Sequence, residues 1–227
     1  MIRNSQIIAF VNNNPAVAEW QELSPGDFSN SPLRIDDIAI DDEEKIKIIA
    51  HHFKAIMKTL GLDLSDDSLK DTPRRVAKMY VKEIFSGLNP SNKPDISLFD
   101  NAYNYSEMLI EKDITLYSYC EHHFVPIIGK AHVAYIPSKK VIGLSKINRL
   151  VQFYSKRPQV QERLTMQIAE GLIEALQTEN VAVKIEAAHL CVASRGIKDT
   201  ASSTTTTAFF GTFQQEKARM EFLSALR

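Results

Sequence analysis

The residues best suited to chemistry lie in the tetrapeptide Cys120-Glu121-His122-His123. Its cysteine and its second histidine stand three residues apart at the end of a strand-like run, a spacing that lets both side chains bind one metal ion. The only other cysteine, Cys191, follows His189 by two residues in a second strand-like run. We expect His189 and Cys191 to share one face of that strand, because side chains alternate along it.

This pattern predicts a metal site with three protein ligands, Cys120, His123 and Cys191. Three ligands leave the fourth position of a zinc ion open to water, which is the arrangement of catalytic rather than structural zinc. His122 and His189 would then lie beside the metal without binding it. Because free imidazoles next to a metal-activated water can exchange protons, the pattern indicates hydrolytic chemistry.

The two cysteines also have simpler explanations. They could be buried apolar residues, since free cysteine often behaves as one. They could form a disulfide, although disulfides are rare in proteins without a secretion signal. A single Cys-x-x-His spacing is a weak signal, and the metal site is favoured because both cysteines lie beside histidines.

The composition is that of an ordinary globular protein. The 227 residues, 44% hydrophobic and 24% charged, can bury a sizeable core as one large domain or one domain with an appendage. The net charge of −1 attracts neither nucleic acid nor membrane, so an anionic substrate would need a local cluster of cations. We find no apolar run of transmembrane length and no signal-peptide pattern, and we expect a cytoplasmic protein.

Two parts of the chain precede the motif. Residues 1–35, rich in Asn, Ser and Pro, are expected to form a poorly ordered arm with a short helix around Ala16–Leu23. Residues 36–227 are expected to form a single domain, in which residues 36–100 are the helical part. Apolar periodicity and caps predict two helices there, one from Asp41 or Asp42 to Leu60 and one from its N-cap Thr72 to Phe85.

Residues 101–227 are expected to hold the sheet and the catalytic residues. Strand-like runs flank the Cys-Glu-His-His turn and recur after two further helices, and a last helix closes the chain. The predicted strands are Glu107–Tyr119, Ile127–Ile136, Val181–Val192 and Ser202–Phe213, and the predicted middle helices begin near Ser145 and Val160. This order predicts an α+β protein whose antiparallel, four-stranded sheet is covered by helices on one face.

Two pairs of cations are candidate anion sites. Arg75 and Lys78 lie three residues apart on a predicted helix and share a face, as do Lys146 and Arg149. The second pair follows Ser145, the expected N-cap of its helix, and helix N-termini bind anions readily. Solvated basic faces with ordinary capping explain the same pattern, so the charges alone leave both interpretations open.

Several longer motifs resemble the GTP cyclohydrolase I family in its bacterial form. They occur in one order from about Ile40 to the C-terminus, which makes the resemblance specific. The matching stretches are Leu62–Leu69 (LDLSDDSL), Thr72–Tyr80 (TPRRVAKMY), Cys120–Phe124 (CEHHF), Gly143–Arg149 (GLSKINR), Arg157–Leu164 (RPQVQERL), His189–Cys191 (HLC) and Arg195-Gly196.

The resemblance implies a tunnelling fold, in which an antiparallel four-stranded sheet is backed by helices, here with an N-terminal helical region. It also implies a homodecamer of two face-to-face pentamers with active sites between subunits. Residues of one site can therefore come from different chains.

The reaction and the residue roles are likewise implied by the resemblance. GTP and water would give formate and 7,8-dihydroneopterin triphosphate at a Zn²⁺ site on the three ligands named above, the first step of tetrahydrofolate biosynthesis. His122 would protonate the guanine ring nitrogen as the imidazole ring opens. The other roles are His189 and Ser145 near the sugar, Glu162 and Gln161 at the guanine edge, and Lys146, Arg149, Arg195, Arg75 and Lys78 on the triphosphate. A carboxylate suits the guanine edge because it accepts hydrogen bonds from N1–H and the 2-amino group.

Two other classes of function remain as alternatives. A related tunnelling-fold enzyme, such as a pterin synthase or a nitrile reductase of deazaguanine metabolism, would use a three-histidine zinc site or a nucleophilic cysteine. A non-catalytic zinc or GTP-binding protein would bind GTP without releasing formate, and it would not need both His122 and His189.

Overall fold

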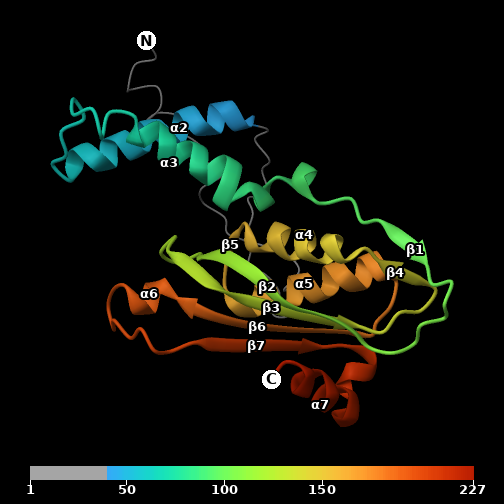
Figure 1. Ribbon diagram of the computed structural model, residues 1–227. Helices are drawn as coiled ribbons and strands as arrows, with labels where there is room; N and C mark the ends of the chain where they lie inside the picture. The colour runs from blue at the N-terminus through green and yellow to red at the C-terminus, as the bar shows by residue number, and fades with distance from the viewer. Residues whose placement is uncertain (1–39) are drawn as a thin grey trace, which may run out of the picture.

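The computed structural model describes residues 40–227, and the arm expected over residues 1–35 lies outside this range. Helices and a mostly antiparallel sheet together confirm the α+β class (Figure 1). In chain order the main elements are α2 (Asp42–Thr59), α3 (Thr72–Met79), β1 (Leu98–Asp100), β2 (Leu109–Cys120), β3 (Pro126–Tyr135), β4 (Lys140–Ile142), α4 (Leu144–Ser155), β5 (Pro158–Gln159), α5 (Gln161–Leu176), β6 (Val181–His189), α6 (Leu190–Ala193), β7 (Thr204–Phe209) and α7 (Glu216–Ala225).

The main sheet has five strands in the order β5-β2-β3-β6-β7, and the prediction of four strands is therefore wrong by one. Strands β2, β3, β6 and β7 are antiparallel to one another where they pair. The additional strand, β5, runs parallel to β2 and pairs Pro158 with Tyr119 and Gln159 with Cys120. A two-residue strand that begins with proline has no alternating pattern, so hydrophobic periodicity cannot predict it. Strands β1 and β4 form a separate two-stranded sheet.

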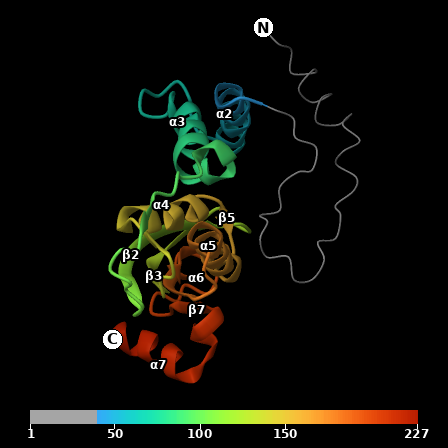
Figure 2. The same ribbon diagram turned by 90° about the vertical axis from the view of Figure 1, so that its right-hand side faces the viewer.

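Helices α4 and α5 cover one face of the main sheet. On β2 the residues Ile114, Leu116, Ser118 and Cys120 are buried, and their alternation with more exposed neighbours points them to this face. Helix α4 packs against β2, and α5 packs against β6 and β7 (Figure 2). The core between these layers therefore holds the side chain of Cys120, which anchors one predicted metal ligand.

The opposite face is covered at one end by α7, which lies on the other side of the sheet from α4 (Figure 2). Phe213 and Phe222 pack there against Ala134 of β3 and Ala182 of β6. Elsewhere this face is open, and Tyr117 on β2 is 61% exposed. Within residues 40–227 we find no helix that is both long and apolar enough to cross a membrane.

The N-terminal helices pack against each other beyond α4 (Figure 2). Asp41 caps α2, as predicted, and its side chain accepts a hydrogen bond from the Glu44 N–H at 2.8 Å. The helix predicted to continue to Phe85 is α-helical only to Met79 and then forms a π-helical turn, Tyr80–Ile84.

Two predicted helix caps are wrong. Asp71, not Thr72, is the N-cap of α3, and Gly143, not Ser145, is the N-cap of α4. The second helix begins directly where β4 ends, and the Lys146 N–H already donates to the Gly143 carbonyl at 2.8 Å. Ser145 therefore lies inside the first turn of α4, where its side chain does not cap the helix.

Candidate active site and metal centre

A tight turn after β2 carries the Cys-Glu-His-His motif. The Cys120 N–H donates to the Val125 carbonyl at 2.9 Å, and the Phe124 N–H donates to the Cys120 carbonyl at 2.8 Å. Phe124 has a φ of 53°, a left-handed conformation uncommon for an aromatic residue, which completes the reversal. The Nδ1 atoms of His122 and His123 consequently lie 3.7 and 3.8 Å from the Cys120 sulfur.

Cys191 joins two residues of this turn in a group of candidate metal ligands. The ligand atoms of Cys120, His123 and Cys191 all lie within 4.8 Å of one another. Zinc bonds of about 2.3 Å to sulfur and about 2.0 Å to nitrogen place tetrahedral ligands about 3.6–3.8 Å apart. The observed 3.8 Å between Cys120 Sγ and His123 Nδ1 agrees with this spacing, so the donor set fits a zinc ion. His122 contacts Cys120 but does not belong to the group found in the described residues.

Cys191 reaches the group from a helix and not from a strand. Strand β6 ends at His189, and Cys191 lies in the short helix α6, so the expectation that these two residues share a strand face is wrong. Strand pairing ends here because β7 begins at Thr204, opposite Ala187, and β3 begins just before the partner of His189. Without a neighbouring strand to hydrogen-bond with, the chain turns into a helix.

Two features define the electrostatic setting of the group, the Cys191 thiol and the Arg195 guanidinium. Burial raises the pKa of the Cys191 thiol above its ordinary value, and the neighbouring Cys120 thiol raises it further. A divalent ion stabilises such thiols as thiolates. Arg195 also reaches the group, since its Nη1 lies 3.0 Å from Nε2 of His123 and a guanidinium can only donate. Among the five predicted triphosphate ligands, Arg195 is thus in contact with the metal group of its own chain.

His189, the last residue of β6, is hydrogen-bonded to a buried polar side chain. Its Nε2 is 2.8 Å from Oε1 of Gln161, the first residue of α5. Burial lowers the pKa of His189, and the negative charge of the adjacent Glu162 partly opposes that shift. The start of α5 therefore brings both residues that were expected at the guanine edge next to the predicted catalytic histidine.

Ser145 and Lys146 lie at the opposite end of the sheet from the metal group. The Asn148 side chain, one turn further along α4, donates to the Glu111 carboxylate at 3.2 Å, near the start of β2. Nine residues of extended strand separate Glu111 from Cys120, which is about 30 Å. Figure 1 likewise shows β4, which leads into α4, far from α6. One chain therefore does not bring these two residues to its own metal group.

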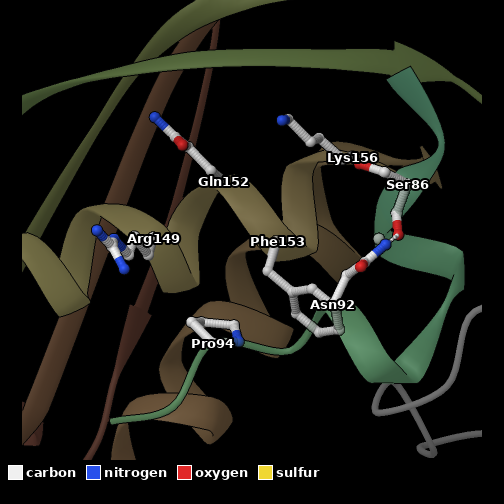
Figure 3. Close-up of a pocket in the computed structure, with 8 residues that line it drawn as sticks. Ser86, Asn92, Pro94, Arg149, Gln152, Phe153 and Lys156 are labelled. Carbon is white, nitrogen blue, oxygen red and sulfur yellow. Dashed lines mark hydrogen bonds between the residues drawn. The ribbon is translucent and has the colours of Figure 1, made fainter. Parts of the chain in front are cut away.

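The other predicted cations are distributed over two further places. Arg149 of α4 and Lys156, which follows that helix, line a cavity of about 310 Å³, whose other wall is the segment around Asn92 and Pro94 (Figure 3). Arg75 and Lys78 are exposed on α3, and Arg75 lies 3.8 Å from the Asp71 carboxylate. After α3, the Tyr80 ring packs edge-on against Phe124, with 6.3 Å between centroids, so the N-terminal helices contact the motif turn.

Sequence reasoning missed the side chains that hold the turn. Arg163 of α5 forms an ion pair with Glu121, and it donates to the Gln159 side chain at 3.1 Å. The Glu121 N–H donates to the Gln159 carbonyl at 3.0 Å, so the turn is tied to both β5 and α5. The position of Glu121 between two predicted ligands was a usable signal, but its partner is 42 residues away and has no sequence signature.

Comparison with known proteins agrees with this geometry. The family model for GTP cyclohydrolase I matches residues 49–227. The chain is 57% identical over 217 residues to GTP cyclohydrolase 1 of Flavobacterium johnsoniae, covering 96% of this chain and 97% of that protein. It is 56% identical over 198 residues to the enzymes of the same name from Enterobacter sp. (strain 638) and Salmonella arizonae, covering 87% of this chain and 89% of each relative.

Among solved structures, the apo crystal structure of an archaeosine synthase QueF-Like aligns with a TM-score of 0.38 at 18% identity, covering 44% of this chain and 90% of that one. A likeness this partial supports no statement about function. The family match and the relatives cover most of the chain, including every residue of the candidate metal group. The chain therefore belongs to the GTP cyclohydrolase I family and is an enzyme.

Proposed function

We propose that this enzyme uses zinc to convert GTP and water into formate and 7,8-dihydroneopterin triphosphate, the first step of tetrahydrofolate biosynthesis. The observation that carries the proposal is the grouping of Cys120, His123 and Cys191 in a chain of this family. A zinc ion with three protein ligands keeps one position for water and lowers the pKa of that water towards about 7, which is the hydrolytic chemistry needed at guanine C8.

The remaining groups supply proton transfer and recognition. His122 delivers a proton to the guanine ring nitrogen, and its 64% exposed side chain is free to reach a substrate beside the metal group. His189 exchanges protons near the sugar, together with Ser145. Glu162 accepts hydrogen bonds from guanine N1–H and the 2-amino group, which adenine does not offer in this arrangement.

The active site in this proposal is shared between subunits of a homodecamer built from two pentamers. Ser145 and Lys146 precede Asn148, which contacts Glu111, and Glu111 lies about 30 Å along β2 from Cys120. They can serve only the metal group of another copy. In the described structure, β7 pairs only with β6, and β5 pairs with only two residues of β2. The outer edge of β7 and most of the outer edge of β2 are therefore open to such a copy. Joining these edges into a ring would give the tunnelling fold.

Arg195 is available to the triphosphate once a metal is bound. If Nδ1 of His123 binds the metal, its Nε2 keeps the ring proton and becomes a donor. A guanidinium only donates, so Arg195 then loses the partner it has at 3.0 Å. We propose that it turns to the phosphates, with Arg75, Lys78 and Arg149 as further cations.

The proposal is tested by incubating the full-length, zinc-loaded protein with GTP. We expect formate, together with a pterin that becomes fluorescent after oxidation, and we expect neither product from ATP. Removal of zinc with a chelator should stop both signals, and re-addition should restore them. GTP binding without formate release would instead identify a binding protein.

A further inference from the structure

The amide of Gln161 is fully enclosed by hydrogen-bond partners. Its side chain is 1% exposed, and its oxygen lies 2.8 Å from Nε2 of His189. Its nitrogen lies 3.2 Å from the Ile185 carbonyl, 3.0 Å from the Thr204 carbonyl and 3.1 Å from the Thr206 hydroxyl. Gln161 therefore connects the imidazole of His189 to the backbones of β6 and β7.

The two carbonyls determine which way round the amide lies. Carbonyl oxygens only accept hydrogen bonds, so the NH₂ group must face Ile185 and Thr204, and the amide oxygen must face His189. An amide oxygen also only accepts, so Nε2 of His189 must carry the proton of that hydrogen bond. In the neutral ring the lone pair is then on Nδ1.

A pair of threonines supports the same direction. The Thr165 hydroxyl donates to the backbone carbonyl of Gln161 at 2.8 Å, so it must accept from the Thr206 hydroxyl, which is 2.7 Å away. Thr206 has thereby used its only proton and accepts from the Gln161 amide. A flipped amide would place its oxygen against two carbonyl oxygens, and the network admits one arrangement only.

We propose that Gln161 is a positioning residue that holds His189 in the Nε2–H tautomer, so that Nδ1 is the nitrogen that exchanges a proton with the substrate. This inference rests on the proposed function and adds to it the identity of the reacting atom. Within residues 40–227 Nδ1 of His189 has no hydrogen-bond partner. His189 precedes Cys191 by two residues in the sequence. Both N–H groups of Gln161 are used by the protein, which leaves them unavailable to guanine.

The first test is a double-mutant cycle on formate release from GTP. General acid–base groups contribute typically about 10²–10⁴-fold, so Gln161→Met should lower kcat by about 10²-fold and leave the dissociation constant of GTP within about threefold. In a His189→Ala background the same change should have no further effect, since residues that act through one another are not additive. The matched control is Thr206→Val, which keeps both carbonyls against the amide and should retain kcat.

Three kinetic outcomes would overturn the inference. Loss of GTP affinity with unchanged kcat would make Gln161 a contact of the base. An undiminished effect in the His189→Ala background would show that Gln161 does not act through His189. An equal loss in Thr206→Val would indicate a purely structural role.

The second test reads the tautomer directly and does not depend on activity. Full-length, zinc-loaded protein with ¹⁵N-labelled histidine is examined by solid-state NMR, and the His189 signals are identified by their absence in His189→Gln. We expect a protonated Nε2 and an unprotonated Nδ1, and the reverse pattern would overturn the inference. If the wild-type protein released no formate from GTP, the proposed function would fail while this measurement still decided the tautomer.

Discussion

Replacing Arg163 with methionine should weaken zinc binding without touching a ligand. The guanidinium pairs with Glu121 and also donates to Gln159, which ties the turn between Cys120 and His123 to α5. The Arg163 side chain is 11% exposed and that of Glu121 is 22% exposed. Removing one partner of a buried ion pair costs about 3–5 kcal/mol, and an exposed pair is worth about 0–1 kcal/mol. For this mostly buried pair we expect a loss of about 2–4 kcal/mol in the free energy of unfolding.

The metal affinity should fall for a separate reason. Mutating a residue that orients a metal ligand without binding the metal typically lowers the metal affinity by about 10–100-fold. We therefore expect Arg163→Met to raise the zinc dissociation constant by about that factor, measured by competition with a chromophoric chelator. Glu121→Gln in the same chain should recover part of the stability, because the unpaired carboxylate is then removed.

Arg157→Met is the matched control. This arginine is also partly buried, lies 4.7 Å above the Phe153 ring and donates to the Gly87 carbonyl at 2.9 Å, so its loss should destabilise the fold. It does not contact the motif turn in the described structure, and zinc affinity should stay unchanged. Unaltered zinc binding in Arg163→Met, or an equal loss in Arg157→Met, would refute the reasoning.

Four further predictions follow from the same structure. Cys191→Ser should remove tightly bound zinc and abolish turnover, and full metal occupancy in that variant would exclude it as a ligand. Glu162→Gln should raise the KM for GTP roughly 10–200-fold and narrow the preference for GTP over ITP, whereas unchanged kinetics would leave this carboxylate only a helix-start role. Lys146→Ala should raise the KM for GTP, and added salt should weaken the wild type in the same direction; a variant that matches wild type at every salt concentration would remove it from the phosphate site. Burial lowers the pKa of His132, whose Nδ1 accepts a hydrogen bond from the Asp113 N–H at 3.2 Å. The contribution of neutral His132 to stability is therefore complete above about pH 6.5 and is lost as pH falls through the lowered pKa. Urea unfolding from pH 7.5 to 5.5 should show this loss, and His132→Gln should flatten it.

Most of the helices could be predicted because their signals are local. Asp41 caps α2 as expected, and apolar periodicity predicted the extent of α2. The middle helices expected near Ser145 and Val160 are α4 and α5. The strands were correct where hydrophobic runs were long and failed where pairing ended. Strand β6 was predicted to continue to Val192, but it ends at His189 because its neighbours provide no further partner.

The candidate ligands were predictable for a related reason. Cys120 and His123 are three residues apart, and two ligands this close in the sequence lie near each other in almost any tertiary structure. Cys191 could be included because the chain has two cysteines and both lie beside histidines. The route by which Cys191 arrives, from the first turn of a helix, was not predictable, since it depends on where β3 and β7 begin.

By itself, the sequence determined which residue types are present and how closely they follow one another. From these came the candidate metal ligands, the expectation of a cation cluster and the α+β class. Only the tertiary structure decided which of these residues meet. It joined Gln161 to His189 across 28 residues and Arg163 to Glu121 across 42, and it placed the start of α4 near Glu111, at the other end of β2 from Cys120. The physical reason is that spacing and periodicity act within a few residues along the chain. Contacts across a sheet depend on strand register and helix packing, which are properties of the whole fold.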